Sequence, residues 1–409
     1  MTSGSDTLEL WGGLECTVVR IGDDFRNQLE ETGHRQRIED LDAIAALGIR
    51  TLRYPAVWET VTPDDPDVCD WRWTDARFAR MRELNIRPIA GLVHHGSGPR
   101  YTNLLDPAFA SLLARYAERV ARRYPWVEMF TPVNEPLTTA RFSGLYGHWY
   151  PHAQSQATFL RALVTECTAT VLAMRAIRGV TPHAKLIQTE DLGKTFGTPL
   201  LRYQADLENE RRWLSLDLLC GRVDRHHPWR KILIENGIGE KELDLFLEAD
   251  AAPDVIGINH YLTSERYLDE QLERYPEWSH GGNGQHRYAD VEAVRMHLPP
   301  GELGPKARLS ETWERYGRPI AVTEAHHGAT RDEQVRWLME VWWAAEDLRA
   351  AGQDIRAVTV WSLFGAVDWN SLLVRRAGFY EPGAFDIRSP QPRKTAIGRA
   401  AQSLQDGRV

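Results

Sequence analysis

Short apolar runs alternate with amphipathic stretches along most of this 409-residue chain. The apolar runs are bounded by polar or turn-forming residues, as buried β-strands are. They lie at Leu8–Gly12, Ile49–Arg53, Arg87–Val93, Val127–Val133, Ala184–Thr189, Val255–Asn259, Pro319–Thr323 and Ala357–Trp361. The stretches between them place apolar residues three and four positions apart, which predicts helices. These are expected at Arg35–Leu47, Trp73–Leu84, 109–120, Thr158–Arg178, Asp332–Ala351 and Thr395–Leu404.

Eight strands separated by helices predict an α/β fold with parallel strands, a (β/α)8 TIM barrel. An open doubly wound sheet is the competing architecture, and it would favour a GxGxxG loop after the first strand. Here Gly12 and Gly13 are followed by Leu14 and Glu15 instead, so the barrel is preferred. We expect a single catalytic domain over residues 1–409. Two insertions are expected in it. The charged region at about 203–244 is expected to be an insertion or a helical pair, and the region at about 274–305 a long loop rich in Gly, His and Pro.

Charge and cysteine content narrow the class of partner. The net charge is −8 and no block of Lys or Arg occurs, which argues against nucleic acid or an anionic membrane as the main partner. Met1–Leu10 has neither the basic nor the apolar region of a secretion signal, and no apolar run is long enough to span a membrane. The cysteines are far apart and form no CxxC pair, which favours reduced thiols and a cytoplasmic location; they are Cys16, Cys69, Cys167 and Cys220.

Polar residues gather at the carboxyl ends of the predicted strands, where barrel enzymes keep their working groups. The set comprises Glu15, Arg53, His94, His95, Asn134, Glu135, Glu190, Asp191, Asn259, Tyr261, Glu324, Trp361, Asp368 and Trp369. Glu135 follows the fourth strand and Glu324 the seventh, so their carboxyls face each other across the mouth. Such a pair can flank a glycosidic bond, at about 5–5.5 Å for retention of configuration or about 6.5–9.5 Å for inversion. The 15 tryptophans suit sugar rings, although tryptophan also fills large cores.

Seven segments in chain order carry a resemblance to a known family. They are Leu10-Trp11-Gly12, Arg53–Trp58, Ile86–Pro88 with Leu92–His94, Thr131–Pro136, Gly257–Tyr261, Val322–Ala325 and Trp361–Trp369. Together they resemble the motifs of glycoside hydrolase family 1, the β-glucosidase and β-galactosidase family. The resemblance implies a barrel that hydrolyses β-glycosides with retention of configuration, without a metal or another cofactor. Its implied partner is a carbohydrate substrate.

The resemblance also implies individual roles. Glu135 would be the general acid/base and Glu324 the nucleophile, with Arg53 and Tyr261 in contact with Glu324. The implied sugar-binding residues are His94, Asn134, Trp361, Asp368 and Trp369, of which Asn134 would bind the 2-hydroxyl and Trp361 would form a floor under the ring.

Four positions depart from the family pattern. Val19 stands at a hydroxyl-binding glutamine, His95 at a tryptophan, Ala325 at an asparagine, and Asp368 at a hydroxyl-gripping glutamate. Glu15 has no counterpart, and it is either a new hydroxyl ligand or an ion-pair partner of Arg20. We therefore expect a sugar other than plain glucose or galactose, such as a deoxy sugar, with Glu15 and His95 supplying replacement contacts.

Two other functions stay open. One is a catalytically silent sugar-binding or scaffold barrel associated with sugar-nucleotide metabolism, since barrels of this kind occur fused to sugar-nucleotide reductases. The other is a transglycosidase, which uses the same residues. A metal site is not expected at the pairs His94-His95, His226-His227 and His326-His327, because adjacent side chains on an extended strand point to opposite faces.

Overall fold

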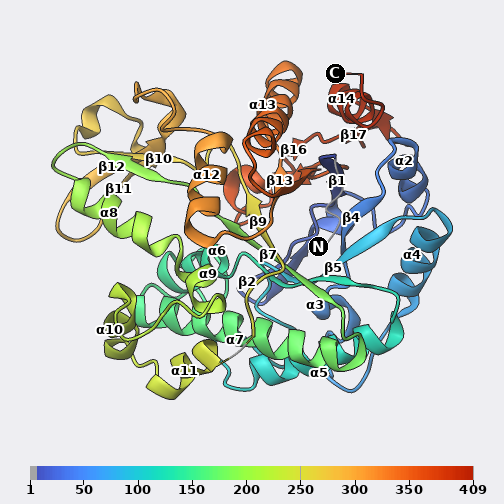
Figure 1. Cartoon of the computed structure of the whole chain (residues 1–409), viewed down its shortest axis with the longest axis horizontal. Coiled ribbons are helices and arrows are strands. Elements are labelled where there is room, and N and C mark those ends of the chain that lie inside the picture. The colour runs from blue at the N-terminus through green and yellow to red at the C-terminus, as the bar shows by residue number, and fades with distance from the viewer. Residues whose placement is uncertain (1–6, 249, 409) are drawn as a thin grey trace.

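The computed structural model describes residues 7–248 and 250–408. Residues 1–6, where part of the search for a secretion signal falls, and residues 249 and 409 of the expected domain lie outside the described residues. Eight parallel strands close a barrel (Figure 1) in the order β1 (Glu9–Gly13), β4 (Thr51–Pro55), β5 (Arg87–His94), β6 (Met129–Asn134), β7 (Lys185–Asp191), β9 (Val255–Asn259), β13 (Ile320–Ala325) and β14 (Ile355–Val360). The predicted barrel is confirmed, and each predicted strand end lies within about two residues of the observed one.

Apolar side chains fill the inside of the barrel. Trp11, Ile89, Ile187 and Ala321 form one buried cluster, and they come from β1, β5, β7 and β13, which are alternate strands of the barrel. Layers built from alternate strands are the usual packing of such barrels. The interior is therefore a solid core, and the chemistry is left to the rim.

Helices surround the barrel (Figure 1), because each has one apolar face that packs against the strands. They are α2 (Asp40–Ala46), α4 (Arg72–Glu83), α5 (Phe109–Arg123), α7 (Gln156–Val180), α12 (Pro305–Tyr316), α13 (Arg331–Ala350) and α14 (Ala396–Gln405). The predicted helix at 35–47 begins only at Asp40, because the preceding residues form turns. There the Asp40 carboxylate binds His34 and Arg37.

The expectation that no apolar run is long enough to span a membrane does not hold for helix α7, which is long and apolar enough by length and composition alone. In this fold 67% of its apolar window is buried, and α7 packs along α5. Its composition therefore matches that of a core helix.

The two insertions differ in structure. Residues 203–244, where an insertion or a helical pair is expected, hold four helices joined by turns, namely α8 (Arg202–Arg211), α9 (Leu214–Leu219), α10 (Pro228–Glu235) and α11 (Glu240–Glu248). The expectation of a loop at 274–305 is wrong in part. β11 (His280–Gly282) and β12 (Arg287–Glu292) join β10 (Arg266–Asp269) and β8 (Thr195–Gly197) in a four-stranded sheet at the upper left of Figure 1.

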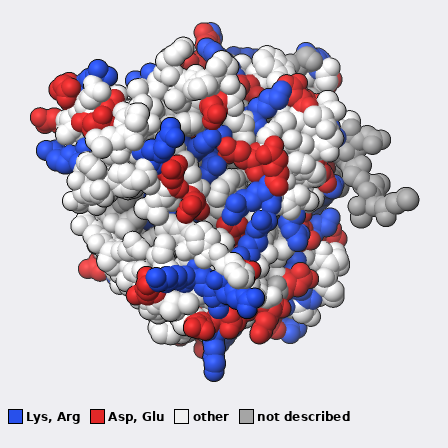
Figure 2. All heavy atoms as spheres, turned by 60° about the vertical axis from the view of Figure 1, so that its left-hand side comes forward, with Lys and Arg blue, Asp and Glu red and all other residues white. Residues whose placement is uncertain are grey.

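Short elements complete the chain, many of them near the carboxyl ends of the barrel strands. They are the hairpins β2 (Val18–Ile21) with β3 (Asp24–Asn27), β15 (Ala366–Val367) with β16 (Tyr380–Glu381) and β17 (Phe385–Asp386) with β18 (Arg393–Lys394), the helices α1 (Gln28–Glu31), α3 (Trp58–Val61) and α6 (Pro136–Ala140), the π-helix η1 (Arg141–Leu145), and the 3-10 turns η2 (Leu272–Arg274), η3 (Glu277–Ser279), η4 (Ala293–Arg295) and η5 (Trp369–Ser371). In the first hairpin Val19 pairs with Arg26. On the face shown in Figure 2, basic and acidic residues are interspersed, in keeping with the moderate net charge of −8.

Candidate active site

Glu324 lies near the end of β13 and is held at both carboxylate oxygens. Arg53 Nη1 donates to Oε1 at 2.7 Å, and the Tyr261 hydroxyl donates to Oε2. The Glu324 residue is only 2% exposed. Two fixed donors leave this carboxylate one orientation, as a nucleophile requires.

An irregularity in β13 aims Glu324 at the mouth. Val322 pairs with Ile258, yet Glu324 pairs with Asn259, so one extra residue is inserted at Thr323. Bulges of this kind often lie beside active sites, where they redirect a side chain. The Thr323 hydroxyl donates to Asn259 Oδ1 at 2.6 Å, which links the bulge to the neighbouring strand.

Glu135 is the N-cap of α6 and adopts a left-handed backbone conformation, with φ 46° and ψ 64°. For a residue with a side chain this conformation costs on the order of 1–3 kcal/mol and persists only where its surroundings enforce it. Asn259 Nδ2 donates to Glu135 Oε1 at 2.5 Å, and the residue is 4% exposed. Pro136 at the first helical position suits the start of a helix.

The two glutamates differ in their electrostatic surroundings. Burial raises the pKa of Glu135 well above its ordinary range, and the carboxyls of Glu324, Asp191 and Glu190 raise it further. Burial also raises the pKa of Glu324, but Arg53 and Tyr261 oppose that effect. Such a separation of two carboxyls favours Glu135 as the protonated acid and Glu324 as the ionised partner.

Asn134, at the end of β6, is fixed by donors to its amide oxygen. Arg53 Nη2 and the Thr189 hydroxyl each donate to Oδ1 at 2.7 Å, and Asn259 Nδ2 lies 3.3 Å away. These donors orient the Asn134 Nδ2 group away from them, toward His94. We call Arg53, Asn134, Glu135, Asn259, Tyr261 and Glu324 the carboxylate network.

The pair His94-His95 corrects the expectation that adjacent histidines point to opposite faces. His95 has a positive φ of 57°, which ends the extended backbone after His94. Both Nε2 atoms consequently lie near Asn134 Nδ2, at 3.3 and 3.5 Å. Burial lowers the pKa of His94 well below its ordinary value and that of His95 to about 3, so both rings are neutral near pH 7.

Trp361 and Glu15 lie beside the network. The Arg53 guanidinium carbon is 4.5 Å from the Trp361 ring centroid, and His94 stacks on the same indole at 5.4 Å. Glu15 Oε1 accepts from the Thr17 amide at 3.0 Å, and Oε2 accepts from Trp361 Nε1 at 3.4 Å. Burial raises the pKa of Glu15 to about 7. Its role as a hydroxyl ligand, like that of Trp361 as a floor, stays a prediction.

Arg20 is not the partner of Glu15. Arg20 pairs instead with Asp23, with 3.0 Å between Nη2 and Oδ1, and it covers the ring of Tyr150. The alternative interpretation of Glu15 as an ion-pair partner of Arg20 is therefore wrong, because Asp23 is three residues from Arg20 in the same hairpin.

Three of the four departures from the family pattern, Val19, His95 and Asp368, lie together on one side of the mouth, whereas Ala325 ends β13. Val19 packs with Trp149, Leu373 and Trp369 in an apolar cluster. His95 touches two of these rings, with centroid distances of 5.1 Å to Trp149 and 5.6 Å to Trp369. We call the group that comprises Val19, His95, Trp149, Asp368, Trp369 and Leu373 the strand-eight wall, because Asp368, Trp369 and Leu373 follow the eighth strand of the barrel, β14.

Asp368 belongs to this wall, but its carboxylate is engaged within the protein. Arg26 Nη2 donates to Oδ2 at 2.9 Å, and the amides of Ala377 and Phe379 donate at 3.1 and 2.8 Å. Asp368 is 1% exposed and Arg26 is 3% exposed. A direct grip of Asp368 on sugar hydroxyls would require these bonds to be shared. In contrast, the Trp369 indole N–H is buried and has no acceptor within the described part of the chain.

No candidate metal centre accompanies this site. Among residues 7–248 and 250–408, no three His, Cys, Asp or Glu side chains are grouped so that they could hold a metal ion.

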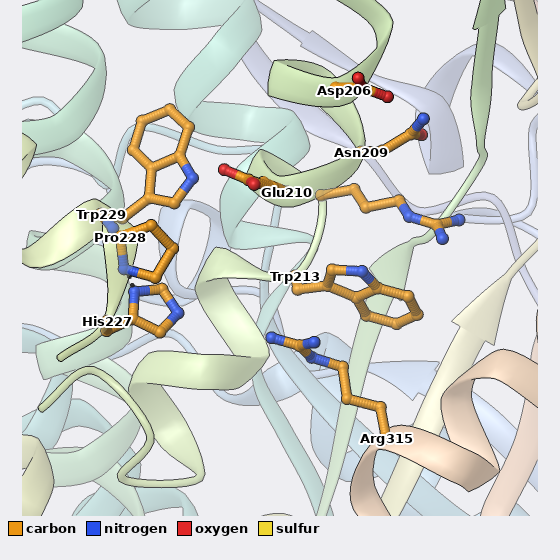
Figure 3. Close-up of a pocket in the computed structure, with 9 residues that line it drawn as sticks. Asp206, Asn209, Glu210, Trp213, His227, Pro228, Trp229 and Arg315 are labelled. Carbon is orange, nitrogen blue, oxygen red and sulfur yellow. Dashed lines mark hydrogen bonds between the residues drawn. The ribbon is translucent and has the colours of Figure 1, made fainter.

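A cavity of about 560 Å³ lies away from Glu135 and Glu324, between α8, the start of α10 and α12 (Figure 3). Its Trp213 ring lies against the guanidinium groups of Arg212 and Arg315, and its lining includes none of the predicted site residues.

Sequence reasoning placed Asn259 at a strand end without giving it a role. The structure connects it to both Glu135 and Asn134, because its Oδ1 is occupied by Thr323 and its Nδ2 is left to donate. The signal was present in the sequence, since an asparagine closes the sixth predicted strand two residues before Tyr261.

Comparisons with known proteins identify the family of the chain. The family model described as Glycosyl hydrolase family 1 matches residues 30–394. Phospho-cellobiase of Klebsiella oxytoca is 24% identical over 310 residues, which span 71% of this chain and 65% of that protein. Beta-glucosidase 47 of Arabidopsis thaliana is 23% identical over 439 residues, 97% of this chain and 80% of that protein.

The fold has a similar counterpart among solved structures. The family 1 b-glucosidase from Thermotoga maritima superposes with a TM-score of 0.77 at 14% identity, covering 100% of this chain and 99% of that one. At this identity the structural similarity supports the barrel fold alone. The family model, in contrast, covers most of the sequence, and the chain therefore belongs to glycosyl hydrolase family 1.

Proposed function

We propose that this protein is a retaining β-glycosidase that acts by double displacement. The observation that carries the proposal is the unequal setting of the two buried glutamates. Glu324 receives a charged donor from Arg53 and a hydroxyl from Tyr261. Glu135 meets the neutral amide of Asn259 and lies near other carboxyls, which keep its proton bound.

In the first step Glu324 attacks the anomeric carbon and the bond from that carbon to the leaving oxygen breaks. Glu135 gives its proton to the leaving oxygen, and a covalent glycosyl-enzyme forms. Asn134 is well placed for the sugar 2-hydroxyl, since its oxygen is taken and its Nδ2 group faces the histidines. Such a contact strengthens as the oxocarbenium-like transition state develops.

In the second step the now ionised Glu135 takes a proton from water, whose oxygen attacks the anomeric carbon. The ester bond to Glu324 breaks, which releases the sugar with retained configuration and restores both carboxyls. A sugar hydroxyl in place of water would make the same enzyme a transglycosidase.

The substrate is proposed to be a β-glycoside whose sugar lacks a hydroxyl on the side of the strand-eight wall, such as a deoxy sugar. Val19 presents an apolar side chain there, and Asp368 is occupied by Arg26. The similar proteins named Phospho-cellobiase and Beta-glucosidase 47 support a β-linked glycoside as the general class.

The test uses an aryl glycoside with fluorine at the second sugar carbon, which slows release of the glycosyl-enzyme. We expect peptide mass mapping to locate the sugar on Glu324, and nuclear magnetic resonance of the first product formed from an ordinary aryl β-glycoside to show the β-anomer. Labelling of Glu135, or an α-anomer as first product, would contradict the proposed mechanism.

A silent sugar-binding barrel is the second candidate, and the engaged carboxylate of Asp368 is the observation that favours it. Calorimetric binding of a monosaccharide without turnover of any aryl β-glycoside would support this candidate. Turnover that is lost in Glu324→Gln would exclude it.

A further inference from the structure

The seam between β6 and β7 changes in character toward the mouth. Ladder pairing joins residues 129–130 to residues 185–186. Beyond that point side chains take over, since the Thr131 hydroxyl donates to the Ile187 carbonyl at 2.8 Å. Toward the rim the seam is therefore held by side-chain bonds, which can be removed one at a time, together with one backbone bond from Glu135 to Thr189.

Residues at the end of β7 form hydrogen bonds to Asn134 and Glu135, the site residues at the end of β6. The Thr189 carbonyl accepts the Glu135 amide at 3.2 Å, and the Thr189 hydroxyl donates to Asn134 Oδ1 at 2.7 Å. Glu190 follows directly, and its side chain is fully buried.

The Glu190 carboxylate binds the first turn of α6, the helix that Glu135 caps. Its oxygens accept the Leu137 amide at 2.9 Å, the Thr138 amide at 3.3 Å and the Thr138 hydroxyl at 3.2 Å. Ser215 Oγ adds a fourth donor at 2.7 Å, from α9. Burial raises the pKa of Glu190 to about 7, although the Leu137 amide, Ser215 and Arg141 oppose that effect. Backbone amides can only donate, so this set of partners suits the ionised form, which Glu190 adopts above that pH.

We propose that Glu190 is a positioning residue for Glu135, which it serves by clamping the first turn of α6 and by keeping a negative charge beside the acid. The proposal rests on the proposed function, since Glu135 is taken to be the general acid/base. The clamp explains why a residue with a side chain stays at φ 46°, because the amides that follow it are anchored to β7. Above about pH 7, where Glu190 is ionised, its charge makes release of the Glu135 proton harder.

Other charged groups also act on Glu135. The titratable groups that face Glu135 are Glu324 from β13, Asp191 and Glu190 from β7, Tyr261 after β9, and His95 after β5. Arg141 from η1, Asp191 and Glu166 from α7 lie within electrostatic range of Glu190. His95 is neutral near pH 7 because burial lowers its pKa to about 3, so carboxyls dominate around the acid.

The decisive variant is Glu190→Gln in the full chain, tested on two aryl β-glycosides of the sugar that the wild type hydrolyses best. One carries dinitrophenol, which leaves without a proton, and the other carries methoxyphenol, which needs one. We expect kcat/KM to fall by roughly 10–100-fold for the methoxyphenyl substrate, a part of what full loss of general acid catalysis costs. The dinitrophenyl substrate should change by less than about 3-fold. The alkaline limb of the pH profile should move down by about one pH unit, as expected on removal of a neighbouring like charge.

Glu166→Gln is the matched control. Glu166 is also a fully buried carboxyl whose pKa burial raises, but it lies on α7 and has no hydrogen bond to α6. It should leave both the leaving-group dependence and the pH profile unchanged. Glu190→Asp keeps the charge with a shorter reach, so it should restore the alkaline limb while the methoxyphenyl substrate stays slow.

Several outcomes would overturn the proposal. Equal losses on both substrates with an unmoved pH profile would reduce Glu190 to a structural group, and an unchanged Glu190→Gln enzyme would remove any role. If Glu190→Gln does not fold, Thr138→Val tests the same clamp and should slow only the methoxyphenyl substrate severalfold, whereas equal slowing of both would refute the clamp. A wild type without any aryl glycosidase activity would refute the proposed function itself, and this inference with it.

Discussion

The two sides of the barrel mouth are built on different principles. In the carboxylate network every oxygen of Glu324 meets a donor, and Arg53 supplies a positive charge between Glu324 and Asn134. In the strand-eight wall the polar group Asp368 turns away to Arg26 and to backbone amides, while Val19 offers only methyl groups. On the proposed function, bond cleavage and sugar selection would therefore fall to separate parts of the rim.

The supporting elements explain why the two sides can vary independently. The network stands on or directly after the barrel strands β4, β6, β9 and β13, which are paired along both edges. The wall is assembled from the hairpin β2–β3, the residue after β5, the loop between η1 and α7, and the segment around η5. Loops on a rigid scaffold tolerate substitution better than the scaffold does. A change of sugar can thus accumulate in the wall while the acid and nucleophile stay in place.

The largest effect is expected from the network, in Glu324→Gln. The amide cannot form the glycosyl ester, so kcat should fall by roughly 10⁴-fold or more, which is the scale of losing a covalent nucleophile. Steady-state hydrolysis of the best aryl β-glycoside measures this. Added azide should rescue Glu324→Ala only to an α-azide, and a β-azide from that variant would reverse the two assignments.

The next effect is expected from Glu135→Ala, and it should depend on the leaving group. A poor leaving group should lose about 10²–10⁴-fold, the usual contribution of general acid catalysis, while an activated aryl group loses much less in the first step. Azide, which needs no general base, should restore turnover and give the β-azide. Because burial and the neighbouring carboxyls raise the pKa of Glu135, wild-type activity should persist into neutral pH and decline on the alkaline side as Glu135 loses its proton. A profile whose alkaline limb survives in Glu135→Ala would contradict this role.

Loss of the Arg26 partner of Asp368 in the strand-eight wall is expected to lower the stability of the fold, and Arg26→Met tests this. Removal of one partner of a buried ion pair costs roughly 3–5 kcal/mol, because the remaining charge is left without compensation. Here Asp368 would be left buried beside Glu31. Arg122→Met is the control, since its pair with Glu118 is exposed on α5 and is worth about 0–1 kcal/mol. Urea unfolding of both variants gives the comparison, and equal losses would show that the Arg26 pair has no special weight.

The same pair predicts a pH dependence with a definite sign. Burial acts to raise the pKa of Asp368, but the Phe379 amide and Arg26 outweigh it and hold this pKa below its ordinary value. A carboxyl with a lowered pKa stabilises the fold above its ordinary pKa of about 4 and loses that contribution as the pH falls through the folded value. The wild type should therefore lose more stability on acidification below about pH 4 than Asp368→Asn. Parallel urea midpoints of the two proteins across that range would disprove it.

The barrel and the carboxylate network could be predicted from the sequence more fully than the strand-eight wall. Buried strands such as 255–259 are recognised by an unbroken apolar run. The residues that end these strands must lie at one rim of the barrel. Glu135, Glu324, Arg53 and Tyr261 could therefore be predicted as neighbours. The strand β12 was missed because its short alternation stands in a Gly- and His-rich segment.

Other features could not be predicted because they depend on distant parts of the chain. Arg26 and Asp368 are 342 positions apart, and no local sequence pattern around either residue predicts their ion pair. The left-handed conformation of His95 is likewise imposed from outside, since a strand pattern alone predicts that its side chain alternates with His94.

The smallest effect in this series, and the one that bears most directly on the wall, is the choice of sugar. A hydroxyl pressed against Val19 and the neighbouring indoles would lose its hydrogen bonds, which costs roughly 1–3 kcal/mol for a buried polar group. A sugar without that hydroxyl avoids the cost, so we expect an aryl β-fucoside or another deoxy sugar to exceed the matching aryl β-glucoside by about 5–100-fold in kcat/KM. Val19→Gln restores a hydroxyl-binding side chain and should shift the ratio toward the glucoside, whereas Val68→Gln, at an exposed position outside the wall, should not. The measurement is a panel of aryl β-glycosides with one common leaving group, ranked for each variant. A glucoside that leads the panel in the wild type would show that Trp369, His95 or Glu15 already meets the hydroxyl, and the wall would then select on shape.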